Sequence, residues 1–562
     1  MKNKQLHLLA AVLSAKGVKQ VVTSPGSRNA PAIVVLNRFP GMQLHSIADE
    51  RSAGFYALGI AQQLQEPVAV LCTSGSAALN YAPAIAEAYY QKIPLIVITA
   101  DRPEMWIDQG DGQTIRQRNL FAGYIRKSYH LPAEINHADQ KRYFARLVAE
   151  AADRAIFPAK GPVHINLPLA EPLYDIEWTE EEALPVPPRV LPSTSSLGKS
   201  ALEELAELWN QSTGKIIIAG QMTPDADVVH LMSRFADDPS VVILSETTSN
   251  LPGIDSIACI DRTIEGIKEE EFDILRPQIL LSVGGAVVSK KIKALLRNIR
   301  PANHWHVSDD PEEFHMDTYG ALTLTIPVET KTFLRQLLDV RVFKESGFRE
   351  LWSAKSKNRQ LLHEKYLAEA PYSDLLVFKQ IFEMLPADFQ LHLGNSTPVR
   401  YAQLFDEASK FTTWSNRGTS GIDGSVSTAA GAAAASNVPV VLITGDIGFL
   451  YDSNALWNSG LSYNLRIILI NNGGGNIFRV IPGPDRYEEL EHFIETRHQH
   501  TAEGIAKTFG LNYSTANSAD ELKPALNHLF GKQHQKAAIL EILTPNKQSA
   551  EVLKDYFKYI SK

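Results

Sequence analysis

Short, nearly continuous runs of apolar and β-branched residues recur along the whole chain, and they constrain its fold more than any other feature. Amphipathic segments such as AALNYAPAIAEAYYQK separate the runs. Strands without polar alternation are buried on both faces, as they are in parallel sheets covered by helices on both sides. We therefore predict an α/β protein built from doubly wound parallel sheets. The runs are QVVTS, PVAVLCTS and IPLIVITAD, then KIIIAGQ, SVVILSETT, QILLSVGG and HWHVSDD, and finally FQLHLGN, FTTWSN, PVVLITGD, LRIILINN and AAILEIL.

The chain has 562 residues, which is too long for a single hydrophobic core. The same alternation of strands and helices occurs in three stretches, so we predict three domains of similar architecture, residues 1–180, 195–340 and 371–562. A proline-rich linker around Pro185 separates the first two domains, and a charged, helical segment over 341–370 precedes the third.

Charge and composition argue against several classes of protein. The formal net charge of −8 disfavours a general nucleic-acid binder, which would need a basic surface to displace counterions. No apolar run is long enough to span a membrane. The segment LHLLAAVLSA superficially resembles a signal peptide, but its leucines have helical spacing and favour an amphipathic helix. The two cysteines, Cys72 and Cys259, form no disulfide framework, so we expect a cytoplasmic protein.

The stretch from residue 438 to 478 predicts a metal site. A buried strand leads into Asp446, and after a helical segment the next strand leads into Asn472 and Gly474. A βαβ crossover returns both strand ends to one edge of the sheet, so these residues should be neighbours. A carboxylate, an amide oxygen and a glycine carbonyl suit Mg²⁺, which completes its shell with phosphate oxygens and water. Taken singly, Asp446 would only cap a helix and Asn472 would only form a turn.

This arrangement resembles the GDG…NN signature of thiamine-diphosphate enzymes. The GD pair at 445–446 and the NN pair at 471–472 stand at the family's spacing, and Ile447 replaces the third residue of the first motif, a glycine. The resemblance implies thiamine diphosphate and Mg²⁺, or Mn²⁺, as cofactors. The metal ligands that it implies are Asp446, Asn472 and the carbonyl of Gly474.

A glutamate in the first domain is the candidate activator of the cofactor. In this superfamily such a glutamate bonds to N1′ of the aminopyrimidine, which then serves as the base. Glu50 fits that position, after a strand and at the start of a helix, although a first-turn glutamate also simply favours the helix dipole. Ile422 is the candidate wedge beneath the thiazolium, or a buried isoleucine beside a glycine turn. Because Glu50 and Asp446 lie in different domains, which the superfamily draws from two subunits, the resemblance implies a homodimer or homotetramer.

Finer motifs narrow the resemblance. TSPGSRNAPAI, DERSAGFYALG, TADRP, DQGDGQTIRQ, SNRGTSGIDG and GGGNIF occur in this order. They resemble the 2-succinyl-5-enolpyruvyl-6-hydroxy-3-cyclohexene-1-carboxylate synthase family of menaquinone biosynthesis, which relaxes the third position of the metal motif. The resemblance implies a transferase that decarboxylates 2-oxoglutarate and adds the succinyl carbanion in a conjugate sense to isochorismate, giving 2-succinyl-5-enolpyruvyl-6-hydroxy-3-cyclohexene-1-carboxylate and CO₂.

Basic residues support this assignment independently. Arg28, Arg102, Arg400 and Arg417 fall at predicted strand ends or turns, where α/β sheets bind ligands. Arginine suits substrates with several carboxylates because its planar group binds a carboxylate bidentately. For any one of these residues a surface ion pair is the commoner explanation, so the argument depends on the set.

The resemblance assigns roles residue by residue. The catalytic residues would be Glu50, Gln113 and Arg28. The cofactor would contact Glu50, Ile422, Asp446, Ile447, Gly448, Asn472, Ile477 and Phe478. The substrates would contact Ser27, Arg28, Arg102, Gln113, Lys290, Lys291, Ser396, Arg400 and Arg417, with Ile477, Phe478 and Ile481 on the apolar side. The family has an arginine where Lys291 stands, so the charge is kept but the planar fork is lost.

Three other functions fit the sequence less well. Another thiamine enzyme, such as an acetohydroxyacid synthase or an oxo-acid decarboxylase, would not need so many cations. A nicotinamide or flavin oxidoreductase would need a GxGxxG turn after a strand, and VGGAVV lacks that spacing. A non-catalytic relative would have lost Glu50, Asp446 or Asn472. His498 and His500, two residues apart, do not share a helix face, so we expect them to be exposed.

Overall fold

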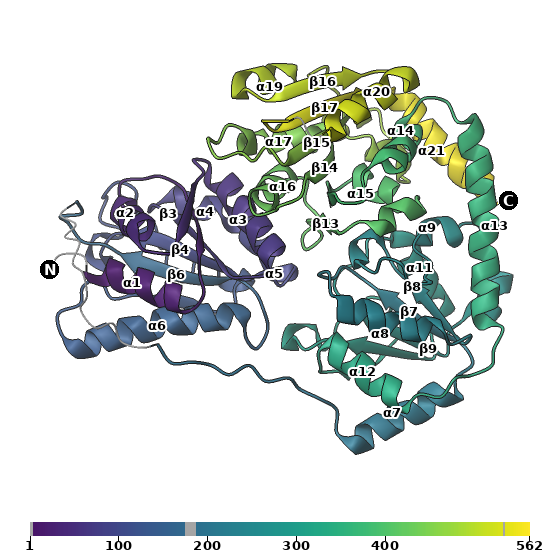
Figure 1. Cartoon of the computed structure of the whole chain (residues 1–562), viewed down its shortest axis with the longest axis horizontal. Coiled ribbons are helices and arrows are strands. Elements are labelled where there is room, and N and C mark those ends of the chain that lie inside the picture. The colour runs from purple at the N-terminus through teal and green to yellow at the C-terminus, as the bar shows by residue number, and fades with distance from the viewer. Residues whose placement is uncertain (1–3, 175–186, 532–533) are drawn as a thin grey trace.

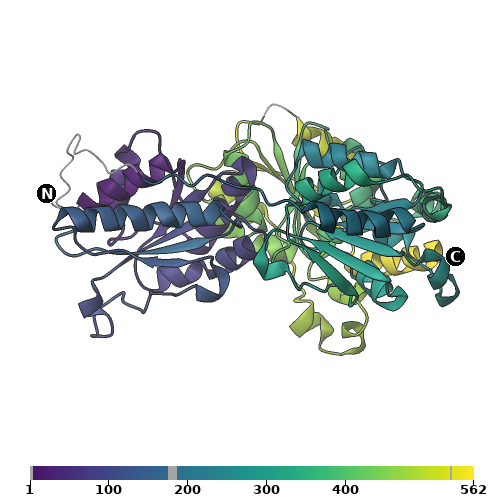
Figure 2. The same ribbon diagram turned by 90° about the horizontal axis from the view of Figure 1, so that it is seen from below.

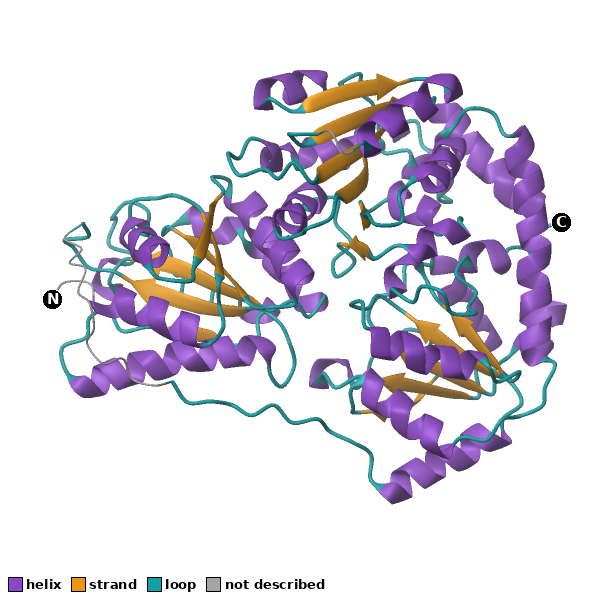
Figure 3. Cartoon of the chain, viewed as in Figure 1, coloured by secondary structure: helices purple, strands orange, loops and turns teal. Residues whose placement is uncertain are grey.

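Three parallel-sheet domains make up the protein, as a computed structural model describes it for residues 4–174, 187–531 and 534–562. Figure 1 shows the domains at the corners of a triangle, and Figure 2 shows from below that the N-terminal and middle domains lie at opposite ends of the long axis. In each domain the strands lie between helices (Figure 3). The predicted α/β class with three doubly wound parallel sheets is confirmed. The predicted boundary at residue 180 and Pro185 lie outside the described residues.

The N-terminal domain contains a six-stranded parallel sheet in the order β2-β1-β3-β4-β6-β5. Its inner strands, such as β3, bury every residue, because helices cover both faces. The strands are β1 (Gln20–Thr23), β2 (Gln43–Ser46), β3 (Val68–Cys72), β4 (Leu95–Asp101), β5 (Ser128–His130) and β6 (Val163–Pro168). The α-helices are α1 (Lys4–Ala15), α2 (Ala30–Arg38), α3 (Glu50–Leu64), α4 (Ser76–Asn80), α5 (Ala82–Tyr90) and α6 (Ala138–Ile156).

The middle domain contains a five-stranded parallel sheet in the order β11-β10-β9-β7-β8. The strands are β7 (Lys215–Ala219), β8 (Val241–Leu244), β9 (Ile279–Val283), β10 (Asn303–Val307) and β11 (Leu322–Ile326). The α-helices are α7 (Lys199–Gln211), α8 (Ala226–Ala236), α9 (Ile260–Thr263), α10 (Phe272–Leu275), α11 (Lys290–Ile299) and α12 (Thr330–Val340). The charged segment predicted to be helical forms α13 (Phe348–Glu369), which runs along the side of the molecule to the third domain (Figure 1).

The C-terminal domain repeats the six-stranded plan in the order β13-β12-β14-β15-β17-β16. The strands are β12 (Gln390–Leu393), β13 (Thr413–Ser415), β14 (Val440–Gly445), β15 (Leu465–Asn471), β16 (Asn512–Ala516) and β17 (Ala538–Leu543). The α-helices are α14 (Asp374–Met384), α15 (Thr397–Ala402), α16 (Ser425–Ala434), α17 (Asp446–Tyr451), α18 (Ile477–Val480), α19 (Glu503–Phe509), α20 (Ala519–Phe530) and α21 (Asn546–Ile560).

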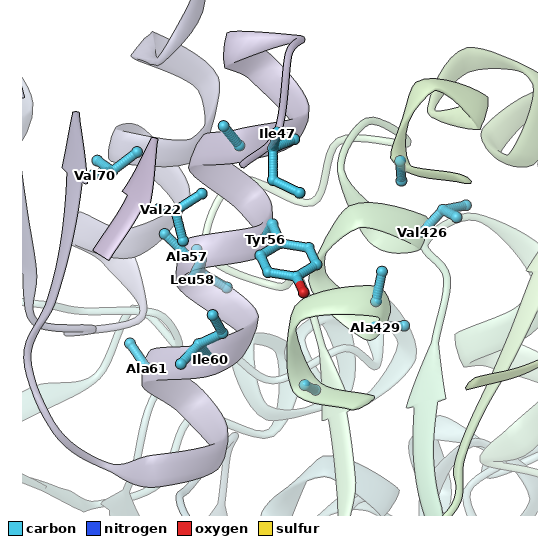
Figure 4. Packing of buried hydrophobic residues seen from close by; sticks show 14 of the residues in the cluster. Val22, Ile47, Tyr56, Ala57, Leu58, Ile60, Ala61, Val70, Val426 and Ala429 are labelled. Carbon is cyan, nitrogen blue, oxygen red and sulfur yellow. The ribbon is translucent and has the colours of Figure 1, made fainter. Parts of the chain in front are cut away.

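The N-terminal and C-terminal domains meet where α3 crosses α16. Tyr56 of α3 lies against this junction beside Val426 and Ala429 of α16 (Figure 4), and all three side chains belong to one buried apolar cluster. Each helix also has a glycine facing the backbone of the other. A side chain at Gly59 would overlap the carbonyl of Thr428, and one at Gly431 would overlap the carbonyl of Tyr56. The close crossing therefore fixes the start of α3 relative to the C-terminal domain.

The middle domain is tied to both other domains by buried polar contacts. Asn250 exchanges two hydrogen bonds with the backbone of Thr413 in β13, at 3.0 and 2.8 Å. Arg126 of the N-terminal domain forms a buried ion pair with Asp310, at 2.5 Å. Within the described part of the chain, no helix is long and apolar enough to cross a membrane.

Candidate active site

The carboxyl ends of β14 and β15 form the corner where the metal ligands were predicted. The two strands pair directly, with Gly445 opposite Ile470, so the residues that follow them emerge side by side. Asp446 begins α17 and is buried. Its Oδ1 accepts the N–H of Ile447 at 2.7 Å, and its Oδ2 accepts the N–H of Gly474 at 2.9 Å. The structure thus brings together segments that are 28 residues apart in sequence.

The side-chain amide of Asn472 is oriented by a residue that sequence reasoning missed. Asn472 Nδ2 donates to Asp374 Oδ2 at 3.0 Å, whereas its Oδ1 is buried and has no hydrogen-bond partner. Asp374 also accepts hydrogen bonds from Thr544 at 2.5 Å and from Ser549 at 3.2 Å. Burial raises the pKa of Asp374, and these donors work in the opposite direction. A buried amide oxygen without a donor is what a hard cation requires, so the corner fits Mg²⁺ or Mn²⁺.

Acidic clusters offer no rival metal site. Among the described residues, no group of three or more His, Cys, Asp or Glu side chains could hold a metal ion. A cation at the β14–β15 corner would therefore depend on one carboxylate together with amide and carbonyl oxygens, which is the donor set that Mg²⁺ accepts when phosphate and water complete its shell.

His498 is not exposed as predicted. Its side chain is only 7% exposed, and Nε2 lies 3.3 Å from Asp446 Oδ2. Its ring stacks on that of His500, which is exposed as expected. The neighbouring Arg497 donates to the backbone carbonyl of Asn472 at 3.0 Å. The prediction for His498 was wrong because the segment is an extended loop folded over the corner, where spacing rules for helices do not apply.

Glu50 is the first residue of α3 and lies in a recess shared by two domains. Asp49 caps the helix, and Glu50 Oε2 accepts a hydrogen bond from Asn80 Nδ2 at 3.1 Å. The recess is lined by N-terminal residues around Glu50 and by Trp457 of the C-terminal domain. Two further contacts hold the domains together here, from Asn454 to Asp49 at 2.7 Å and from Arg51 to the carbonyl of Tyr451 at 2.8 Å.

Ile422 lies close to α17. A side chain at Gly448 would approach the carbonyl oxygen of Ile422 to 3.4 Å, which shows how closely the two segments pack. The Ile422 side chain is 37% exposed and therefore available to a ligand. The alternative prediction for Ile422, a buried isoleucine beside a glycine turn, is therefore wrong.

Arg400, which is half-buried, and Arg417, which is buried, form a basic pair on the C-terminal domain. Arg417 is 8% exposed, donates from Nη1 to Asn395 Oδ1 at 2.7 Å, and leaves its buried Nε without a partner. Arg400 donates to the carbonyl of Ser396, which caps α15. Burial lowers the pKa of both arginines, and Arg400 lowers that of Arg417 further, while the Asp261 carboxylate opposes the shift at Arg400. Arginine stays charged far above neutral pH, so the pair can bind a carboxylate.

The predicted substrate residues of the N-terminal domain follow β1 and β4. Arg28 is buried, with an ion pair to Glu171 at 3.1 Å, and the preceding Ser27 is exposed. Arg102 pairs with Asp111 at 3.1 Å. Gln113 is exposed and has a positive φ of 58°, and its backbone lies against Gly75. These residues therefore gather at the carboxyl edge of the sheet, where α/β domains bind ligands.

Two lysines begin α11 of the middle domain and differ in their surroundings. Lys290 is exposed. Lys291 forms an ion pair with Glu265, and its ammonium lies 3.3 Å from the centre of the Phe557 ring, so it has partners outside the predicted pocket. The predicted apolar residues Ile477 and Phe478 of α18 and the following Ile481 are half-buried.

Comparison with known proteins shows that two parts of the chain match thiamine pyrophosphate binding domains. Residues 4–120 match the model of the thiamine pyrophosphate enzyme N-terminal TPP binding domain, and residues 394–542 match that of the C-terminal TPP binding domain. Three relatives named 2-succinyl-5-enolpyruvyl-6-hydroxy-3-cyclohexene-1-carboxylate synthase are similar over almost the whole chain. They come from Flavobacterium johnsoniae (43% identity, 98% of each chain), Christiangramia forsetii (43%, 98% of each chain) and Porphyromonas gingivalis (40%, 99% of this chain and 97% of the relative).

Proposed function

The chain belongs to the 2-succinyl-5-enolpyruvyl-6-hydroxy-3-cyclohexene-1-carboxylate synthase family of thiamine pyrophosphate enzymes, and from this membership we propose its substrates, metal and site residues. The enzyme decarboxylates 2-oxoglutarate and adds the remaining succinyl unit to isochorismate, in menaquinone biosynthesis. The observation that carries this proposal is the pair of half-buried Arg400 and buried Arg417, which offers two cations and an unpaired N–H to substrates rich in carboxylates. A thiamine enzyme for a simple oxo acid would not need them.

The cation and the diphosphate belong at the β14–β15 corner. Asp446, Asn472 and the carbonyl of Gly474 would hold Mg²⁺ or Mn²⁺, and the free Oδ1 of Asn472 supports this assignment. Ile447, Gly448 and the start of α18 border the same corner and would contact the cofactor.

Glu50 would hold the proton that activates the cofactor. Thiamine diphosphate would supply, when bound, a nucleophilic carbon that adds to the oxo carbon of the 2-oxo acid and a thiazolium ring that stabilises the negative charge left on that oxo carbon by CO₂. Glu50 would share a proton with N1′ of the aminopyrimidine, and Ile422 would support the thiazolium from below. Arg28 and Gln113 would orient the acceptor and offset the charge that develops on it.

We also assign the enzyme to the cytoplasm, as a homodimer or homotetramer. Both cysteines are buried and unpaired, as in proteins of a reducing compartment. Around the Glu50 recess, the large apolar side chains of Leu79, Tyr451 and Trp457 are about half exposed, at 48%, 52% and 48%. Clustered exposed apolar side chains mark interaction surfaces, and a second copy of the chain would cover them and complete the site.

A reconstitution assay tests the proposed function. The protein is mixed with thiamine diphosphate, Mg²⁺, 2-oxoglutarate and isochorismate, each component is omitted in turn, and the loss of isochorismate is followed by absorbance. We expect loss only in the complete mixture. Isochorismate that persists, with CO₂ released from another oxo acid, would contradict the substrates and leave the cofactor chemistry standing.

Replacing Asp374 by asparagine is expected to weaken activation by Mg²⁺ by about 10- to 100-fold, the usual cost of losing a residue that orients a metal ligand. The asparagine amide carries a donor N–H as well as an acceptor oxygen, so it no longer selects one orientation of the Asn472 amide as the carboxylate does. The concentration of Mg²⁺ that gives half-maximal activity measures the effect. An unchanged Mg²⁺ dependence would remove Asp374 from the metal site.

Replacing Arg400 by alanine is expected to raise the KM for 2-oxoglutarate or isochorismate by about 10- to 100-fold, because hydrogen bonds between charged groups contribute about 1.5–3 kcal/mol. Arg400→Lys, which keeps the charge but not the planar fork, should lie between the variant and the wild type. Steady-state kinetics with each substrate in turn measure both. Equal KM values in all three proteins would exclude Arg400 from the pocket.

A further inference from the structure

A buried glutamate of the N-terminal domain forms hydrogen bonds with a loop of the C-terminal domain. Glu87, in α5, is 1% exposed. Its carboxylate accepts the N–H groups of Gly418 and Thr419, both at 2.7 Å, and the Thr419 hydroxyl at 2.6 Å. The partners are more than 330 residues apart in sequence. A buried carboxylate is costly to desolvate, so three donors from another domain show that this contact is built into the fold.

The loop that Glu87 holds carries two of the predicted site residues. We define the site loop as residues 416–424, which include Arg417 and Ile422. Asn395 fixes the loop from its own domain: its Nδ2 donates to the carbonyls of Asn416 and Gly421, both at 2.6 Å, and its Oδ1 accepts from Arg417. Glu87 holds the same loop from another domain, at the two residues that follow Arg417.

The middle domain joins the same junction through two glutamines. Gln91, one turn after Glu87, donates to the Glu87 carboxylate. Gln221 follows β7 of the middle domain and donates to Gln91 at 3.0 Å and to the carbonyl of Ser415 at 2.9 Å. All three domains thus meet at the start of the site loop.

Sterics leave the loop little freedom. A side chain at Gly418 would lie 2.7 Å from the Glu87 carbonyl oxygen and 3.0 Å from Oε1. Ser420 has φ +63°, a conformation that non-glycine residues adopt only when their surroundings impose it. The electrostatic influence of Glu87 extends to the Arg417 guanidinium.

We propose that Glu87 is a positioning residue for substrate binding: it holds the site loop so that Arg417 presents its unpaired Nε, and Ile422 its exposed side chain, to the ligands. Glu87 touches no ligand itself and acts through the loop. The inference rests on the proposed function, because it takes Arg417 as a substrate-binding residue.

The test is Glu87→Gln, which keeps the size of the side chain but replaces one acceptor by a donor that faces a backbone N–H. We expect the KM for the substrate that Arg417 binds to rise about 10- to 100-fold, in line with the loss of charged hydrogen bonds. In the Arg417→Ala background the same change should have little further effect on KM, because Glu87 acts through Arg417. A contribution to stability alone would not produce this coupling.

Two further variants separate the positioning role from a loss of stability. Asp238→Asn removes a buried carboxylate that accepts from Ser240 at 3.0 and 2.6 Å, far from the site loop in sequence and in another domain, and should lower the unfolding temperature with KM unchanged. Thr419→Val removes one of the three hydrogen bonds that the site loop donates to Glu87 and should raise KM about threefold. If Glu87→Gln does not fold, the KM of Thr419→Val tests the proposal instead.

The outcomes are distinguishable. An active wild type with unchanged KM in Glu87→Gln, or in Thr419→Val if only that variant folds, would overturn the inference alone. Equal effects of Glu87→Gln in the wild-type and Arg417→Ala backgrounds would also overturn it. A wild type that does not consume isochorismate would overturn the proposed function instead.

Discussion

Replacing Glu50 by glutamine is expected to lower turnover by about 10²- to 10⁴-fold, the usual contribution of a positioned acid–base group. Glutamine can still accept the hydrogen bond from Asn80, but it cannot share a proton with the cofactor ring. The fold should persist, because Asp49 and Arg51, not Glu50, bind the C-terminal domain at this point. Deuterium exchange at C2 of the bound thiamine diphosphate measures the effect directly.

Glu150→Gln provides the matched control. Glu150 also lies in a helix of the N-terminal domain, and its side chain is 45% exposed in an ion pair with Lys127. Surface ion pairs contribute little, so its removal should alter neither exchange nor turnover. If Glu50→Gln exchanged deuterium as fast as this control, Glu50 would not be the activating carboxylate.

Replacing Asp446 by asparagine is expected to weaken the binding of thiamine diphosphate and Mg²⁺ by more than about 100-fold, because a direct ligand should matter more than its supporting residues. The variant keeps the shape of the side chain but loses the charge that faces the cation. Calorimetric titration with the cofactor at fixed Mg²⁺ measures the loss. Asp485→Asn, an exposed position of the same domain, is the control, and equal affinities in the two variants would contradict the metal assignment.

The same two variants test the proposed assembly. If each active site takes Glu50 from one subunit and Asp446 from another, then refolding Glu50→Gln together with Asp446→Asn creates mixed dimers with one intact site. We expect activity to return in the mixture at saturating cofactor. Activity that stays at the level of the separate variants would show that each site lies within one subunit.

Most inner strands could be predicted from the sequence, but half of the edge strands could not. β3, β9 and β15 are continuous apolar runs because helices cover both of their faces. The missed edge strands β5, β11 and β16 expose part of their residues, so their sequences do not differ from those of loops. β6 was missed for another reason. In β6 the buried polar residues His164 and Asn166 interrupt the apolar run, and both form hydrogen bonds with Thr99.

Some residues of the candidate site could also be predicted from the sequence, whereas others could not. Asp446 and Asn472 could be predicted as neighbours because a βαβ crossover has only one common geometry. Asp374 could not be found, because it lies 98 residues before Asn472 and begins a helix, where an acidic residue ordinarily interacts only with the helix dipole. The role of Glu87 could not be predicted from the sequence either. It is a single glutamate in the apolar helix APAIAEAYY, and its hydrogen-bond partners come from another domain of the folded chain.

Isotope tracing is the most direct measurement of the central claim. The wild-type enzyme would convert 2-oxoglutarate labelled with ¹³C at C1, in the presence of isochorismate, and mass spectrometry would follow the label. We predict that all of the label leaves as ¹³CO₂, and that the product has the mass of isochorismate plus an unlabelled succinyl unit. Label retained in the product, or CO₂ released without a product of that mass, would contradict the assignment.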